Sequence, residues 1–335
     1  MRPVRPLPLL AAAAIVAVGS LSLVALARHG DAGDTGLAAP PPGAARYALS
    51  TVGMSFPFAA AIAKGFRQAA QKAGARAIVL DGKANIQKQA NDIDDLIAQR
   101  PQGLAIMPLD SIVAQGWVGR AQAARVPVVA VAALVGDPRR RAVTDVYPGL
   151  AALVSQDEVA TGRAAGDLAA DILPAGQTAR IAIVEGAAGF PEVEQRTRGF
   201  LAGLAARRIP YAIVATQPGN WTPEGGEAVC QNMLAANPRI DLFFNQADDM
   251  VIGCARAVRA AGSKARLIGI GGSRLAIASL KAGAINGTVC FQPEALGALA
   301  FAAMQRPPAP GTPRFRTYPI HAVTRATASD CTGQW

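Results

Sequence analysis

The stretch SQDEVATGRAAGD, residues 155–167, is where the predicted fold divides into two halves. An apolar strand ends just before it, and Asp157 stands at the strand tip, where its carboxylate can cap the helix that follows. Gly162 and Gly166 lie four residues apart, on one face of that helix, so a neighbouring helix can pack closely against it. The pattern of apolar strands and helices starts again after Asp157, so we expect the second half of the fold to begin here.

On both sides of Asp157, short apolar runs alternate with stretches of helical spacing. Before it, we predict strands at 47–52, 77–80, 103–107 and 126–131, and helices at 58–73, 87–99 and 111–124. After it, we predict helices at 158–172, 193–206, 223–236, 249–261, 274–282 and 293–304, and strands at 181–184, 211–215, 242–245, 266–270 and 287–290. Continuous apolar strands separated by helices indicate parallel sheets covered on both faces. The predicted fold is α/β, with two doubly wound parallel-sheet lobes.

The first 27 residues have the features of a targeting segment. Arg2 and Arg5 precede an apolar run at 7–27, and Ala25-Leu26-Ala27 fits a cleavage site. Residues 1–27 are therefore a signal peptide or, since the run is long enough to span a bilayer, an uncleaved N-terminal anchor. Residues 28–45, rich in Gly and Pro, are expected to form a flexible linker. Either reading predicts an exported protein.

The composition excludes several functions. The net charge is +10, but the positive residues are scattered and no basic stripe is interleaved with aromatic residues, which argues against nucleic-acid binding. The chain has only two histidines, His29 and His321, so a histidine-based metal site or catalytic triad is not expected. Gly-x-Ser-x-Gly and CxxC motifs are absent, and Gly269-x-Gly271 lacks the later glycine of a dinucleotide fingerprint. We expect no cofactor and no enzymatic activity.

The cysteine count suggests disulfides. The chain contains Cys230, Cys254, Cys290 and Cys331, and an even number in an exported protein permits two bridges in three pairings. Cys230 and Cys254 fall on successive predicted helices that flank one strand, and Cys290 ends a strand while Cys331 lies in the tail. We favour the pairs 230–254 and 290–331. Buried free thiols remain the alternative.

Several stretches resemble one known family in their order and spacing from Arg46 to Val323. Besides 155–167, they are Ser50-Thr51, Pro57-Phe58, and the runs at 123–129, 186–200, 217–221, 232–238, 245–250, 269–272 and 283–293. Together they resemble the type I periplasmic substrate-binding proteins of ABC importers, the ribose-binding family. The resemblance implies a first lobe of 46–156 plus 292–319 and a second lobe of 157–291 plus 320–335.

The resemblance also implies how such a protein works. Three crossovers would form a hinge, with Asp157, Phe291 and Gln292 at two of them. A small-molecule ligand would sit between the lobes, at the carboxyl ends of the strands. The expected protein is a periplasmic monomer that captures its ligand and passes it to an inner-membrane ABC permease. A membrane-tethered ligand-sensing subunit is the alternative.

The binding residues that the resemblance implies are only partly matched. Arg196 corresponds to a ligand-clamping arginine that can donate two parallel hydrogen bonds, and Phe58 and Trp221 correspond to aromatic walls on opposite lobes. Gln246 falls in the same part of the site, and Asp248 is expected to cap a helix. The remaining positions depart from the family pattern: Ala132 and Ala133 replace an acid and an arginine, Ala247 an asparagine, Gly271 an aspartate and Phe291 a glutamine.

These departures predict a pocket less polar than a ribose site. Each sugar hydroxyl left unpaired in a closed site costs roughly 1–3 kcal/mol, so ribose bound in the usual way should fail. Acids beside Arg196, with Glu185 and Glu194 as candidates, would suit a different sugar. Otherwise we expect a less hydroxylated sugar, an apolar or aromatic compound, or an acidic metabolite held by Arg196.

Overall fold

The computed structural model describes residues 41–174, 176–309 and 311–335, all within one structural unit. The predicted leader at 1–27 and most of the predicted linker lie outside the described residues. Among the described residues, no helix combines the length and the apolar character needed to span a membrane.

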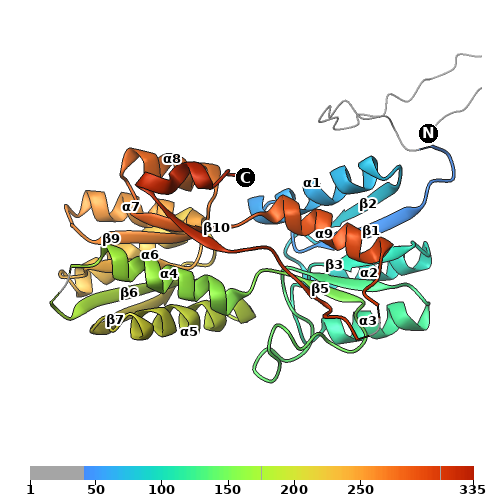
Figure 1. Ribbon diagram of the computed structural model, residues 1–335, viewed down its shortest axis with the longest axis horizontal. Coiled ribbons are helices and arrows are strands. Elements are labelled where there is room, and N and C mark those ends of the chain that lie inside the picture. The colour runs from blue at the N-terminus through green and yellow to red at the C-terminus, as the bar shows by residue number, and fades with distance from the viewer. Residues whose placement is uncertain (1–40, 175, 310) are drawn as a thin grey trace, which may run out of the picture. The chain divides into compact units, whose positions relative to one another are not determined.

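The described strands form two six-stranded sheets, one in each lobe (Figure 1). The first, in the order β11-β5-β4-β3-β1-β2, consists of β1 (Arg46–Thr51), β2 (Arg76–Asp81), β3 (Gly103–Ile106), β4 (Val128–Val131), β5 (Ala152–Val154) and β11 (Phe315–Arg316). The second, in the order β12-β10-β9-β8-β6-β7, consists of β6 (Ala179–Glu185), β7 (Tyr211–Pro218), β8 (Leu242–Asn245), β9 (Arg266–Gly271), β10 (Gly287–Cys290) and β12 (His321–Thr324). All pairs are parallel except β10 with β12. The predicted fold class is confirmed.

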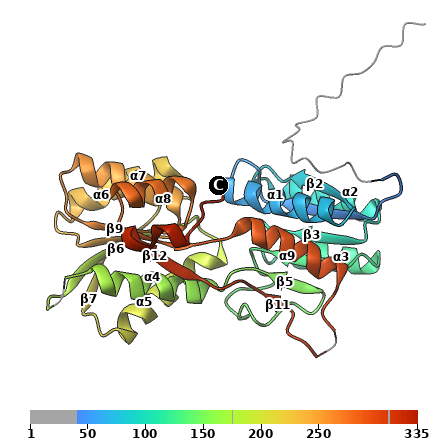
Figure 2. The same ribbon diagram turned by 45° about the horizontal axis from the view of Figure 1, so that its top comes forward.

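Helices cover both faces of the first sheet. Successive side chains of a strand point to opposite faces, and in these buried strands both faces carry apolar side chains that pack against helices. In β1, Leu49 packs on one side with α1 (Pro57–Lys72) and α9 (Pro293–Gln305). Ala48 packs on the other side with α2 (Ile86–Ala98) and α3 (Ala114–Ala123). Figure 2 shows α1 and α9 running side by side.

The second sheet is covered in the same way. On one face lie α6 (Pro223–Ala236), α7 (Asp248–Ala260) and α8 (Arg274–Ala282). On the other lie α4 (Glu158–Ile172) and α5 (Pro191–Ala206), and the chain closes with the 3₁₀ helix η1 (Arg325–Asp330). Helix α4 has the predicted bounds.

Helices α4 and α5 pack with their backbones in contact, as the small residues in 155–167 predict. A Cβ atom on Gly162 would overlap the backbone carbonyl of Arg196, and one on Gly199 would overlap the carbonyl of Val159. The close approach brings the first turn of α4 against the middle of α5. It therefore fixes where Glu158 and Arg196 meet.

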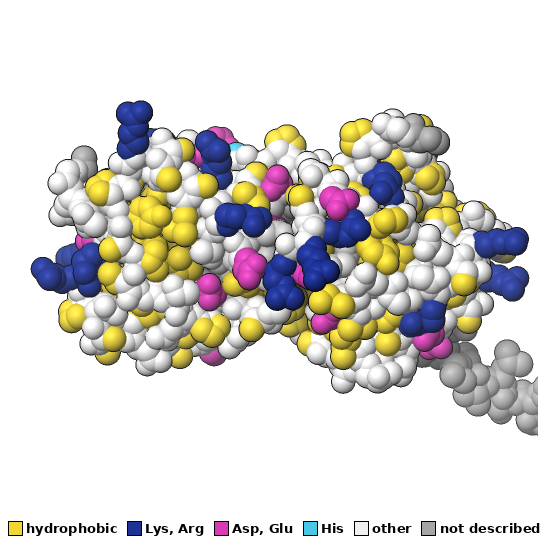
Figure 3. Space-filling view, turned by 90° about the horizontal axis from the view of Figure 1, so that it is seen from below, with side chains coloured by type: hydrophobic (Ala, Val, Ile, Leu, Met, Phe, Trp, Pro, Cys, Tyr) yellow, Lys and Arg dark blue, Asp and Glu magenta, His cyan; other side chains and the backbone are white. Residues whose placement is uncertain are grey.

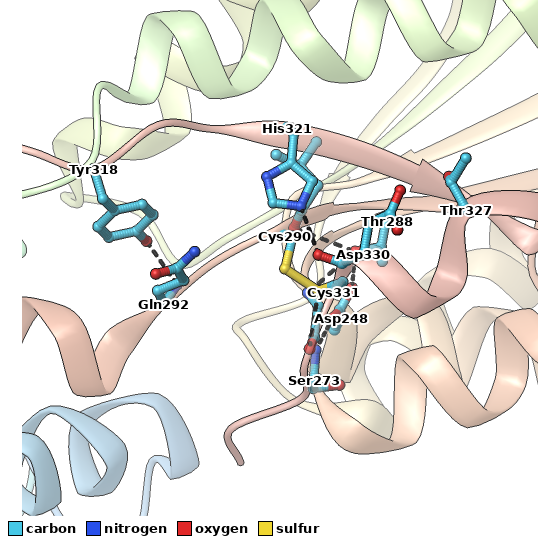
Figure 4. Close-up of a disulfide and its surroundings, with 12 residues drawn as sticks. Asp248, Ser273, Thr288, Cys290, Gln292, Tyr318, His321, Thr327, Asp330 and Cys331 are labelled. Carbon is cyan, nitrogen blue, oxygen red and sulfur yellow. Dashed lines mark hydrogen bonds between the residues drawn. A yellow bond between two sulfur atoms is a disulfide. The ribbon is translucent and has the colours of Figure 1, made fainter.

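The chain passes between the two sheets three times. At the first crossover Asp157 caps α4, its Oδ1 accepting hydrogen bonds from the amides of Val159 (3.0 Å) and Ala160 (2.9 Å). The second and third crossovers are linked, because the amide of Gln292 donates to the Tyr318 hydroxyl at 3.0 Å (Figure 4). We propose these segments as the hinge, with the lobe boundaries expected from the sequence.

Both predicted disulfides are present, so the alternative of free thiols is wrong. Cys230–Cys254 joins α6 to α7 with a Cα–Cα distance of 5.3 Å. Cys290–Cys331 joins the end of β10 to the tail, with a Cα–Cα distance of 5.8 Å.

Candidate ligand-binding site

A cavity of about 140 Å³ lies at the carboxyl ends of the parallel strands and is lined by both lobes. One buried water needs roughly 10–15 Å³, so the cavity has room for a small organic molecule. The first lobe contributes Val52, Phe56, Pro57, Phe58, Ala59, Met107, Pro108, Ala132 and Ala133. The first crossover and the second lobe contribute Gln156, Glu158, Phe190, Glu192, Arg196, Trp221, Ala247, Asp248, Asp249, Ile270, Gly271, Phe291 and Trp335.

The first-lobe side of the cavity carries only apolar side chains. Phe58, in the first turn of α1, packs against Phe291 with ring centroids 6.0 Å apart. Ala132, just after β4, has a φ of +65°, and its carbonyl accepts a 2.7 Å hydrogen bond from the Ser155 hydroxyl. The polar side chains that line the cavity therefore all come from the crossover and the second lobe.

Trp221 lines the cavity and has an unusual backbone conformation. Its φ of +62° is rare for a bulky residue, and such strain is concentrated at functional sites. Gly186 leaves the space for the indole, since a Cβ atom there would overlap the ring. Phe190 contacts the same indole edge-on, with centroids 6.0 Å apart.

Arg196 is buried and already paired. Its Nε and Nη2 donate to the two carboxylate oxygens of Glu158 at 2.7 and 3.0 Å, and its Nη1 donates to the Gln246 carbonyl at 2.6 Å. The guanidinium also lies over the rings of Trp221 and Phe291, 5.6 and 5.3 Å from their centroids. The two parallel hydrogen bonds that the sequence predicted between Arg196 and a ligand are thus made to Glu158 instead.

The acids beside Arg196 are Glu158 and Glu192, and the expectation of Glu185 or Glu194 is wrong. Positions 192 and 196 are four residues apart and share one face of α5, whereas Glu194 points away and is exposed. Burial and the charge of Glu158 raise the pKa of Glu192 to about 7, although Arg196 acts in the opposite direction.

Asp248 does not cap α7, which corrects the sequence-based expectation. The N-cap residue is Ala247, and the Asp248 carboxylate instead accepts 2.7 Å hydrogen bonds from the Ser273 amide and the Thr288 hydroxyl. Burial raises its pKa to about 6, against the effect of these two hydrogen bonds. Asp248 thus ties the start of α7 to the β9–α8 turn and to β10.

Gln246 lies behind the cavity wall. Its Oε1 accepts from the Gly186 amide at 3.0 Å, and its Nε2 donates to the Val193 carbonyl and the Thr197 hydroxyl. It therefore holds the loop and the helix that carry the site. The other expected residues come together in the cavity: Phe58, Ala132, Arg196, Trp221, Ala247, Gly271 and Phe291.

Trp335 is a cavity residue that the sequence analysis missed. Its indole contacts the ring of Phe58 edge-on, with centroids 5.7 Å apart and planes at 78°. A signal was available, because Cys331 was paired with Cys290, the neighbour of the expected site residue Phe291. That pairing forces the tail towards the site.

The raised pKa values predict how stability depends on pH. Glu192 and Asp248 titrate near 7 and 6 in the folded protein and near 4 when unfolded, so the folded state binds more protons between these values. The free energy of unfolding should therefore fall as the pH rises from about 4.5 to 7. Glu192→Gln should flatten this slope in urea denaturation at several pH values. The exposed Glu194→Gln variant serves as the control, and parallel profiles for the two variants would contradict the assignment.

Two parallel α/β lobes with a cavity at their strand ends define a two-lobed binding protein. A family model described as a periplasmic binding protein domain matches residues 47–306, and the chain belongs to this family. The ribose import binding protein of Bacillus subtilis is 31% identical over 252 residues, covering 75% of this chain and 78% of the relative. The D-allose-binding periplasmic protein of Escherichia coli is 29% identical over 266 residues, covering 78% and 84%.

Solved structures agree with this assignment. The Caulobacter myo-inositol binding protein, bound to myo-inositol, superimposes with a TM-score of 0.77 at 25% identity, covering 88% of this chain and 97% of that one. A solute-binding protein from Mycobacterium smegmatis with bound glycerol superimposes with a TM-score of 0.77 at 26% sequence identity. The match covers 88% of this chain and 98% of that one. The predicted family, type I periplasmic sugar-binding proteins, is confirmed, and its members are binding proteins rather than enzymes.

Proposed function

We propose that the protein is an exported receptor that captures a small molecule between its two lobes and delivers it to an ABC permease in the inner membrane. The observation that carries this proposal is the cavity, which combines side chains of both lobes with the first crossover at its wall. Rotation of the lobes about the crossovers would open and close such a cavity. The family to which the chain belongs supports a periplasmic location.

The ligand we propose has one apolar face and hydrogen-bond donors on the other. The first-lobe wall is apolar, which suits the C–H face of a ring. The opposite wall carries four carboxyl groups and one guanidinium. Because Glu158 and Glu192 surround Arg196, a ligand carboxylate would meet more repulsion than attraction there. An acidic metabolite is therefore disfavoured, and a sugar-like molecule with few hydroxyls on one face is favoured.

Small-angle scattering and thermal denaturation test the receptor function. In both measurements, D-ribose, D-allose, myo-inositol and glycerol are added one at a time. Native mass spectrometry of protein purified from its own host then shows whether a small molecule co-purifies. Binding should raise the melting temperature and reduce the radius of gyration as the lobes close. Ala133→Trp, which fills the apolar wall, should abolish both responses.

Different outcomes test the receptor function and the proposed class of ligand separately. Micromolar binding of D-ribose would overturn the low-polarity pocket and leave the receptor function intact. Identical scattering and melting with every compound, together with no co-purified small molecule, would remove the receptor function itself.

A further inference from the structure

The tail that follows η1, residues 331–335, is held in place by several contacts. The Cys290–Cys331 disulfide joins it to β10, and the His321 ring lies 3.1 Å from the Asp330 carbonyl just before it (Figure 4). Beyond the disulfide, the Arg274 amide donates to the Trp335 carbonyl at 2.8 Å. These anchors all belong to the second lobe.

The same tail also reaches the first lobe. The amide of Glu294, in the first turn of α9, donates to the Gln334 side-chain oxygen at 2.9 Å. The Trp335 ring meets Phe58 of α1. The tail thus contacts both lobes, and beyond its backbone link to η1 the disulfide is its only covalent bond to the other described residues.

Two glycines, Gly271 at the end of β9 and Gly272 in the turn that follows, leave room for the tail. A Cβ atom on Gly271 would lie 3.0 Å from Trp335 Cζ2, and one on Gly272 would overlap the Cys331 sulfur. Both residues have positive φ values, +147° and +65°, which glycine adopts at little cost. The indole therefore occupies the place beside β9 where a side chain at position 271 would otherwise enter the cavity.

We propose that Trp335 is a specificity-determining residue of the ligand site, held in place by the Cys290–Cys331 disulfide. Its indole supplies an aromatic wall, together with Phe58, for an apolar ring face of the ligand. Full affinity then depends on the disulfide, since without it the tail has only hydrogen bonds and ring contacts to hold the indole in the cavity. This inference rests on the proposed function.

The test compares matched variants by calorimetry. The probe is the tightest binder to the wild type among D-ribose, D-allose, myo-inositol, glycerol and any small molecule that co-purifies with the protein. Trp335→Ala should weaken binding at least tenfold, and Trp335→Phe should restore most of it because an aromatic face remains. Cys290→Ala/Cys331→Ala should also weaken binding several-fold, and dithiothreitol should do the same to the wild type.

The other disulfide provides the control. Cys230→Ala/Cys254→Ala removes a bridge of the same lobe that joins α6 to α7 and does not hold the tail, so its affinity should stay within twofold of the wild type. Unchanged or tighter binding by Trp335→Ala would overturn the role of the indole. Normal binding by Cys290→Ala/Cys331→Ala would overturn the dependence on the disulfide. If the wild type bound none of the four probes and carried no co-purified small molecule, the receptor function and this inference would fall together, whereas the outcomes above leave the receptor function standing.

Discussion

Glu158→Ala should lower the free energy of unfolding by about 3–5 kcal/mol, because it leaves a buried guanidinium without its partner. The side chains of Arg196 and Glu158 are only 8% and 5% exposed, so water cannot replace the lost carboxylate. The Gln246 carbonyl and the nearby Glu192 would compensate only part of the loss. Urea denaturation at pH 7, followed by circular dichroism, measures the effect.

A surface ion pair of the same length is the matched control. Arg120 and Asp94 are also 2.7 Å apart, but their side chains are 47% and 54% exposed. Asp94→Ala should therefore cost less than about 1 kcal/mol. Figure 3 shows acidic side chains among the Lys and Arg side chains near the centre of one face, where water likewise screens the charges. Equal losses for Glu158→Ala and Asp94→Ala would mean that burial does not set the strength of the inner pair.

The buried pair also changes how Arg196 variants should be interpreted. Removing Arg196 leaves the buried Glu158 without its partner. A loss of binding could then come either from a distorted cavity wall or from a lost contact with the ligand. A variant at Trp221 or Phe58 reports on the cavity more directly, since neither side chain takes part in the ion pair.

The fold could be predicted because its signals are local. The strands are continuous apolar runs, and helix α4 combines a capping aspartate with small residues on one face, so its bounds were predicted correctly. The cysteine pairs followed from the elements that carry them. Cavity residues at strand ends, such as Ala132 and Gly271, were also accessible, since the carboxyl ends of parallel strands meet at one edge.

The rest of the site depends on contacts that a linear pattern does not contain. The partner of Arg196 is set by how α4 and α5 pack, which brings Glu158 to the guanidinium from 38 residues away. Whether Asp248 caps its own helix or bonds to Ser273 depends on the path of a neighbouring turn. Trp335 reaches the cavity only because the tail returns to β10, so its role follows from a long-range link.

Cys230→Ala/Cys254→Ala should lower the free energy of unfolding by about 3.5 kcal/mol. The two cysteines are 24 residues apart in the sequence, and a loop of that length restricts the unfolded chain by roughly this amount in the chain-entropy model. Both residues are fully buried between α6 and α7, and alanine avoids placing unpaired hydroxyl groups in that core. Guanidinium denaturation of the variant and the wild type under oxidising conditions gives the difference.

The second bridge makes this prediction more discriminating. Cys290 and Cys331 are 41 residues apart, so the same model gives a loss of about 3.9 kcal/mol for Cys290→Ala/Cys331→Ala. The two double variants should thus be almost equally destabilised, yet only the one that frees the tail should lose ligand affinity. A loss below about 1 kcal/mol for Cys230→Ala/Cys254→Ala would contradict the chain-entropy account of this bridge.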